Sequence, residues 1–206
     1  MVVHSFPLPL HGHVCSSEFS NVYEPTEDKF LLLDTLEPAV PELAEVEICL
    51  EVWSGSCMVS AFLPSLIGLQ VFYICTDVNP EATACTLETA HCNSFHIQPD
   101  ITNLVKGLLP RLKEKVVLLI FNLHYVVTPP EEVGSHGVEA AWAGGRNGRE
   151  VMNRFFQLDS DLLSPRGLFY LVTIKKIILE ENCSTAGGNV DWCNHCGNHY
   201  GDTSKN

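Results

Sequence analysis

An asparagine and a tyrosine at the end of a hydrophobic stretch are the residues of this chain best suited to chemistry. Residues 116–121 read VVLLIF, an apolar run typical of a strand buried on both faces. Asn122 follows directly, and Tyr125 comes three residues later. A side-chain amide can donate to and accept from another amide or a base edge. Asn122 and Tyr125 are therefore candidate catalytic residues, although a simple strand end is the alternative interpretation.

A second group of candidates lies at the ends of two earlier predicted strands. Glu51 precedes a turn that contains Gly55, where a glycine lets the backbone approach a ligand closely. Asp77 ends the next strand, a position from which a carboxylate commonly accepts hydrogen bonds from a ribose diol. An ordinary turn and a helix-capping acid are the alternatives. The spacing from Glu51 to Asp77 fits one βαβ unit, which favours nucleoside binding.

A third pattern, near the end of the chain, has the spacing of half a zinc site. Cys193, Cys196 and His199 could join Cys183 or His195 in a tetrahedral site. No second matching pair exists, and the surrounding residues are rich in Asn, Gly and Thr. We therefore expect no metal site.

The elements that must position these residues alternate between strand and helix. Hydrophobic spacing and turn residues predict helices at 25–36, 57–66, 80–92 and 150–163 and strands at 46–52, 71–75, 97–101, 116–121 and 167–174. Such alternation predicts an α/β fold with a doubly wound, mostly parallel sheet. The long loop at 126–149 is of a length that usually carries function.

The bulk composition indicates one domain and narrows the classes of ligand. The 206 residues carry a net charge of −13, which disfavours nucleic acid as a partner because DNA binding depends on Lys and Arg. No run is long and apolar enough to cross a membrane, and no export signal is recognisable, so we expect a protein of the cytoplasm or nucleus. We expect a mobile arm at 1–22, a domain at 23–175 and an unstructured tail at 176–206.

Several motifs together resemble one family, the eukaryotic HemK-like methyltransferases. They are Tyr23-Glu24-Pro25, Glu27-Asp28, Leu31-Leu32-Leu33-Asp34, Glu51 with Gly55, Asp77, Asn122 with Tyr125, and AWAGGRNGRE at 141–150. The resemblance extends from about residue 11 to residue 175. It is to the branch that methylates the glutamine of the Gly-Gly-Gln motif in a class-1 translation termination factor. Adenine-N6 DNA methylation has also been assigned to that branch.

The resemblance implies a class I, Rossmann-like methyltransferase fold and S-adenosylmethionine as methyl donor. It also implies a heterodimer with a small zinc-binding activator protein. Glu51 and Gly55 would belong to the donor-binding turn, and Asp77 would hold the ribose hydroxyls. Asn122 would bind the glutamine amide beside the donor, and Tyr125 would pack next to it.

The chain departs from the family pattern at several of these sites. The family has glycine at Trp53 and Cys57, threonine at Lys29, aspartate at Val117, an acid at Asn103, and proline at Leu123 and His124. We expect Trp53 to be the most damaging, because a large indole stands where the turn must leave room for the donor. The family also continues past residue 175 into a final β-hairpin that we expect this chain to lack. We therefore expect an impaired methyltransferase; the alternatives are an active enzyme and a catalytically dead protein that only binds the activator.

Overall fold

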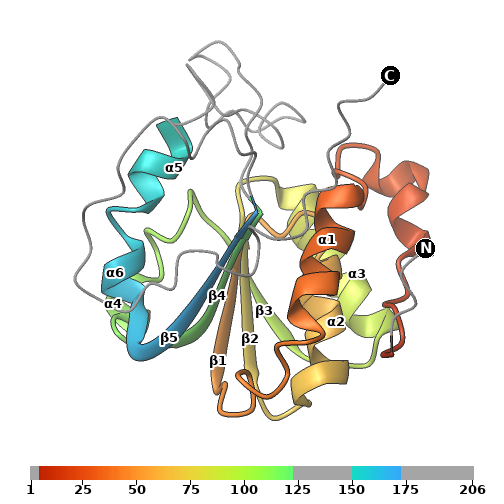
Figure 1. Ribbon diagram of the computed structural model, residues 1–206. Coiled ribbons are helices and arrows are strands. Elements are labelled where there is room, and N and C mark those ends of the chain that lie inside the picture. The colour runs from red at the N-terminus through yellow and green to blue at the C-terminus, as the bar shows by residue number, and fades with distance from the viewer. Residues whose placement is uncertain (1–4, 123–149, 173–206) are drawn as a thin grey trace, which may run out of the picture.

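The structure is a computed structural model that describes residues 5–122 and 150–172. Its centre is a five-stranded parallel sheet in the order β3-β2-β1-β4-β5. The strands are β1 (Ile48–Val52), β2 (Phe72–Asp77), β3 (Ile97–Ile101), β4 (Val116–Asn122) and β5 (Leu163–Val172). Figure 1 shows them with their carboxyl ends towards the top of the view. The predicted α/β fold with a doubly wound parallel sheet is confirmed.

Helices cover both faces of this sheet (Figure 1). One face carries α1 (Glu27–Leu36), α2 (Met58–Ile67) and α3 (Pro80–Cys92), and the other carries α4 (Leu109–Leu112), α5 (Glu150–Phe155) and α6 (Asp159–Leu162). The predicted helix at 80–92 is confirmed at both ends. It begins where expected because the Asn79 side chain accepts a hydrogen bond from the Glu81 amide at 2.9 Å, and Pro80 needs no donor there.

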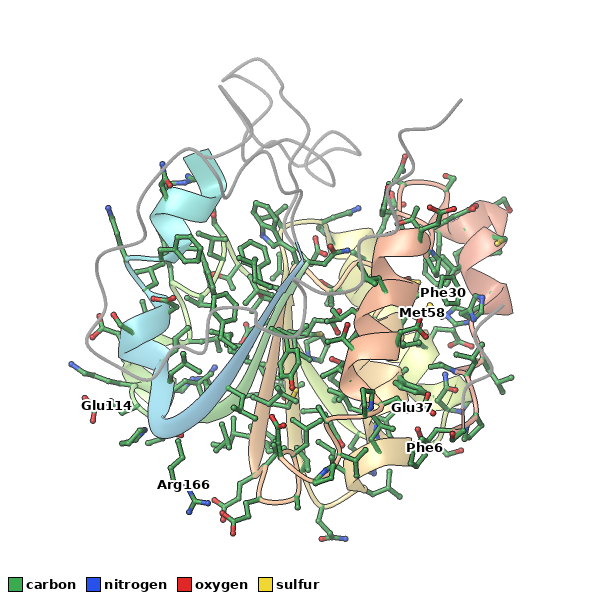
Figure 2. The ribbon with its side chains drawn as sticks, in the orientation of Figure 1. Phe6, Phe30, Glu37, Met58, Glu114 and Arg166 are labelled. Carbon is green, nitrogen blue, oxygen red and sulfur yellow. The ribbon has the colours of Figure 1, made fainter. Side chains whose placement is uncertain are left out.

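The N-terminal residues differ from the predicted mobile arm, because residues 5–22 pack against the domain. They contain two 3-10 helices, η1 (Gly12–Cys15) and η2 (Ser17–Phe19). Val14, Phe19 and Val22 are buried in a small apolar cluster with residues of α3. Figure 2 shows Phe6 beside the helical layer, where it packs against the main core. Widely spaced apolar residues thus hold a segment that lacks the regular periodicity of a helix or strand.

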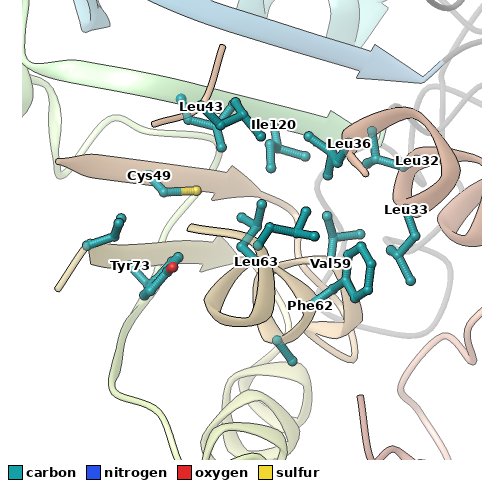
Figure 3. Close-up of a cluster of buried hydrophobic side chains, with 14 of the residues drawn as sticks. Leu32, Leu33, Leu36, Leu43, Cys49, Val59, Phe62, Leu63, Tyr73 and Ile120 are labelled. Carbon is teal, nitrogen blue, oxygen red and sulfur yellow. The ribbon is translucent and has the colours of Figure 1, made fainter. Parts of the chain in front are cut away.

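The main core lies between β1, β2 and β4 and the helices α1 and α2. Figure 3 shows Leu32 and Leu36 of α1 and Leu63 of α2 pointing towards Cys49 and Ile120 of the sheet. All five side chains are fully buried. A second core on the other face contains Phe121 and Phe155 among its buried residues. Strands β1 and β4 are therefore covered on both faces, which fits the apolar run that predicted β4.

The segment from 150 to 172 differs from the predicted helix 150–163 and strand 167–174. The helix is broken into α5 and α6, and β5 begins at Leu163. Residues 156–158 separate the two helices, and the Leu158 amide there donates to the Phe155 carbonyl at 2.7 Å, three residues back instead of the four of an α-helix. The predicted loop 126–149, the tail 176–206 and the expected loss of the final hairpin lie outside the described residues.

Candidate functional site

The candidate site lies at the carboxyl ends of β1, β2 and β4, which are neighbours in the sheet. Val52 of β1 pairs with Thr76 of β2 on one side and with Phe121 of β4 on the other. The residues that follow these three positions therefore meet at one edge. They line a single small cavity, whose walls are Asn21, Tyr23, Lys29, Trp53, Gly55, Asp77, Asn79, Ala82 and Asn122. The structure thus brings together Gly55, Asp77 and Asn122 as expected, while Tyr125 lies outside the described residues.

The turn after β1 holds three residues in the left-handed backbone region. Trp53 has a φ of 57°, Gly55 of 57° and Cys57 of 61°. A glycine adopts this conformation freely, whereas a residue with a Cβ is strained by roughly 1–2 kcal/mol. Trp53 and Cys57 are the two turn positions at which the family pattern has glycine. The turn therefore has the left-handed backbone conformation that favours glycine, although two of these three positions carry side chains.

Glu51 is buried and holds this turn to α2. Its Oε2 accepts hydrogen bonds from the backbone amide of Ser60 at 3.0 Å and from the Ser60 hydroxyl at 2.5 Å. Burial raises the pKa of Glu51, and the positive charge of Lys29 opposes that rise. Glu51 therefore supports the turn from behind, and it is not among the residues that line the cavity.

Asp77 bridges the ends of β1 and β2. Its Oδ2 accepts from the Gly55 amide and its Oδ1 from the Asn79 amide, both at 2.9 Å. Burial raises the pKa of Asp77, while these two amides and Lys29 favour the ionised form. A carboxylate offers about four acceptor positions, so acceptor capacity would remain for a ribose hydroxyl.

Lys29 of α1 is the residue whose role the sequence did not predict. Its side chain is buried, and Nζ donates to the Ser54 carbonyl at 2.9 Å and to the Ser56 Oγ at 3.3 Å. Burial lowers the pKa of Lys29, and attraction to Glu51 and Asp77 opposes the change. The signal was present in the spacing, because Lys29 stands three and four residues before the buried Leu32 and Leu33 and so shares their helix face.

Trp53 points towards the opposite face of the sheet from Lys29. The indole is buried in the second core, where it contacts the ring of Phe121 edge to face with 5.6 Å between the ring centres. Trp53 thus borders the cavity from one side and Lys29 from the other.

Asn122 is the lining residue of this cavity that ends β4. It is 8% exposed, and its Oδ1 has no hydrogen-bond partner within 5–122 and 150–172. A buried amide oxygen without a partner costs about 1–3 kcal/mol, so a water molecule or a ligand that donates to it would be stabilising.

Comparisons with known proteins identify the family. The chain is 72% identical over 181 residues to Methyltransferase HEMK2 of Homo sapiens, which covers 88% of this chain and 85% of that protein. The chain belongs to the HEMK2 methyltransferase family. It is also 32% identical to the eRF1 methyltransferase catalytic subunit mtq2 of Schizosaccharomyces pombe, over 85% of this chain and 82% of that one. No family model matches the chain.

The fold comparison agrees with this assignment. Precorrin-6y C5,15-methyltransferase from Geobacter metallireducens GS-15 superposes with a TM-score of 0.52, covering 84% of this chain and 78% of that one at 10% identity. At 10% identity the similarity is evidence for the fold alone. Together with the parallel sheet it confirms the Rossmann-like methyltransferase fold.

A HEMK2-type methyltransferase implies S-adenosylmethionine as donor, but the side chains at this site do not fit it. The cavity between Lys29 and Trp53 has a volume of about 20 Å³. One water molecule needs about 10–15 Å³ on this scale, whereas small-molecule sites measure roughly 300–1,000 Å³. The space at the turn after β1 is therefore filled by this chain's own side chains.

Two other expectations concern metal and membrane. Within the described ranges no three His, Cys, Asp or Glu side chains come together in a way that could hold a metal ion. The possible half-site at Cys193, Cys196 and His199 lies outside those ranges. None of the described helices has the length and apolar character to span a bilayer.

Proposed function

We propose that this chain is a glutamine N-methyltransferase of the HEMK2 family with an impaired donor site. Its substrate would be the glutamine of the Gly-Gly-Gln motif in a class-1 translation termination factor, and its methyl donor S-adenosylmethionine. The observation that carries the proposal is the buried Oδ1 of Asn122 at the end of β4, which has no hydrogen-bond partner among the described residues; Asn122 lines the same cavity as Gly55 and Asp77. The Schizosaccharomyces pombe relative, which is named as an eRF1 methyltransferase subunit, supports the substrate.

Asn122 suits the binding of a primary amide. Its Oδ1 accepts one N–H of the glutamine side chain and so orients the amide nitrogen towards the mouth of the turn. Tyr125 packs beside the amide in this proposal. Asp77 holds the turn in place through the Gly55 amide. Positioning is the contribution expected of these residues, since no acid or base of the described site reaches the substrate nitrogen in the proposal.

The proposed impairment rests on three residues at or against the turn. Lys29 and Trp53 fill the cavity, and Trp53 and Cys57 stand on a backbone suited to glycine. Loss of donor binding by about 4 kcal/mol would weaken affinity roughly a thousandfold. We expect methyl transfer by the unsubstituted chain to be far slower than by an intact family member.

The test restores the family residues at the site. A variant with Lys29→Thr, Trp53→Gly, Leu123→Pro and His124→Pro is incubated with labelled S-adenosylmethionine and a peptide containing Gly-Gly-Gln. We expect label in this peptide and none in a matched Gly-Gly-Asn peptide. Adding Asn122→Ala should abolish transfer. Labelling of a DNA duplex instead of the peptide would favour the adenine-N6 alternative, and labelling of neither would contradict the proposal.

A second candidate function is binding of the zinc-binding activator without catalysis. The observation that favours it is that β3 is the outermost strand of the sheet in the described part of the chain, and its Ile101 is 56% exposed. Unpaired strand edges are sites at which a partner can add a strand. Co-expression with the activator should give a co-purifying complex, and Ile101→Lys should weaken it while Leu69→Lys, at an exposed position outside the strands, should not. Failure to co-purify would exclude this candidate.

A further inference from the structure

We propose that the Lys29 ammonium group occupies the space at the turn after β1 where the methyl donor would bind. We propose also that it keeps a cationic nucleoside donor out of this site. The inference deepens the proposed function, on which it rests, by naming the residue that closes the site. Sequence comparison alone points to Trp53 instead, because an indole is the larger intrusion. The contacts of the two side chains argue for Lys29.

The position of Nζ over the turn is the first argument. A Cβ built on Gly55 would lie 3.2 Å from Lys29 Nζ, closer than about nine in ten real Cβ contacts. Gly55 is the one glycine of the turn, and its bare backbone is what would let a ligand approach. In this chain the ammonium group already occupies that face and donates to the Ser54 carbonyl at 2.9 Å.

The charge of the site is the second argument. Lys29 faces the two carboxylates at this end of the sheet, Glu51 and Asp77, and is attracted to both. The Glu51 side chain is only 1% exposed, so a cation nearby compensates its charge better than water can. S-adenosylmethionine carries a sulfonium cation, which the Lys29 ammonium at this site would repel. A buried ammonium therefore opposes the donor by charge as well as by volume.

The contacts of Trp53 are the third argument. Its indole borders the cavity and also packs edge to face with Phe121 in the second core, so only part of it faces the site. Removal of the indole leaves the Lys29 ammonium and its hydrogen bonds in place. Trp53→Gly alone should therefore open the site incompletely.

The experiment measures donor affinity by titration calorimetry in a common background of Trp53→Gly, Leu123→Pro and His124→Pro. Adding Lys29→Thr should tighten S-adenosylmethionine binding at least about tenfold. Adding Lys29→Met, which keeps the length of the side chain and removes its charge, should give an intermediate gain of about threefold. Lys113→Thr, the same change at an exposed lysine of the fourth helix's end, should give none.

The outcomes separate this inference from the proposed function. If the background binds the donor and Lys29→Thr adds nothing, Lys29 is not the barrier, and the proposed function stands. If Lys29→Thr admits the donor but no Gly-Gly-Gln peptide is methylated, the inference stands and the proposed function fails. If the background variant is unfolded by circular dichroism, Lys29→Thr alone is compared with the unsubstituted chain, and the absence of a gain there overturns the inference.

Discussion

The hydroxyl of Ser60 lies 2.5 Å from a buried carboxylate oxygen of Glu51 and fixes the position of the turn relative to α2. Ser60→Ala should lower the free energy of unfolding by about 1.5–3 kcal/mol, because the lost bond has a charged partner. Ser65→Ala is the matched control in the same helix, since its hydroxyl donates to the neutral carbonyl of Phe62 at 2.7 Å. That control should cost about 0.5–1.5 kcal/mol. Urea unfolding measures both, and equal losses would contradict the role given to Glu51.

Two opposing effects at Trp53 determine its contribution to stability: backbone strain and side-chain packing. Trp53→Gly relieves the positive φ by roughly 1 kcal/mol but removes a buried indole, a loss of about 3–5 kcal/mol. The lost packing outweighs the relieved strain, so the Trp53→Gly variant should be less stable by about 2–4 kcal/mol. Cys57→Gly relieves the same strain with a much smaller buried side chain and should change stability by less than about 1 kcal/mol. A stabilising Trp53→Gly in thermal unfolding would mean that strain dominates the turn.

At the scale of elements, Asn79 joins α3 to the N-terminal segment. Its Oδ1 caps the helix through the Glu81 amide, and its Nδ2 donates to the Asn21 carbonyl at 2.8 Å. Asn79→Ala should cost about 1–2 kcal/mol by loss of the cap and the link. Asn79→Asp keeps the cap and loses the link, so it should cost less while still loosening residues 5–22. Hydrogen exchange of those residues measures the loosening, and unchanged protection in both variants would contradict the link.

The sequence predicted the elements whose signals are local. The helix α3 has a cap, a proline and regular spacing at its start, and β4 has an uninterrupted apolar run, so both were found. The meeting of Gly55, Asp77 and Asn122 also followed from the rule that parallel strands end at one edge. The contact of Lys29 with the turn did not follow, because it depends on how α1 packs across the sheet. The helix 150–163 was wrong because the chain turns at 156–158, where the Leu158 amide bonds to the Phe155 carbonyl three residues back instead of four.

At the scale of the whole molecule, stability should depend on pH through buried acids such as Asp159. Burial raises the pKa of Asp159 to about 6, so the folded state holds its proton more tightly than the unfolded state. This contribution to stability is full below about pH 4 and is lost as the pH rises through 6.

Asp159→Asn removes this dependence. It should therefore raise the free energy of unfolding at pH 7 by about 1 kcal/mol, with the gain shrinking towards pH 4. The nearby Asp161→Asn, at a half-exposed side chain, should change stability by less than about 0.5 kcal/mol. Denaturant unfolding at several pH values measures the trend, and a gain that grows towards acid would reverse the sign argued here.

The whole molecule combines a HEMK2-family scaffold with a donor turn that its own side chains fill. The sheet, both helical layers and the ends of β1, β2 and β4 are arranged as a methyltransferase needs them. The cavity at that edge has a volume of about 20 Å³, so the scaffold is in place but the space for a donor molecule is not. Family membership and catalytic competence are therefore separate properties of this chain.

Titration calorimetry of the unsubstituted chain with S-adenosylmethionine tests this account most directly. We predict a dissociation constant weaker than about 100 μM, because Lys29 and Trp53 must both move before a nucleoside can enter. A chain that is folded by circular dichroism and still binds the donor more tightly than about 100 μM would contradict the account.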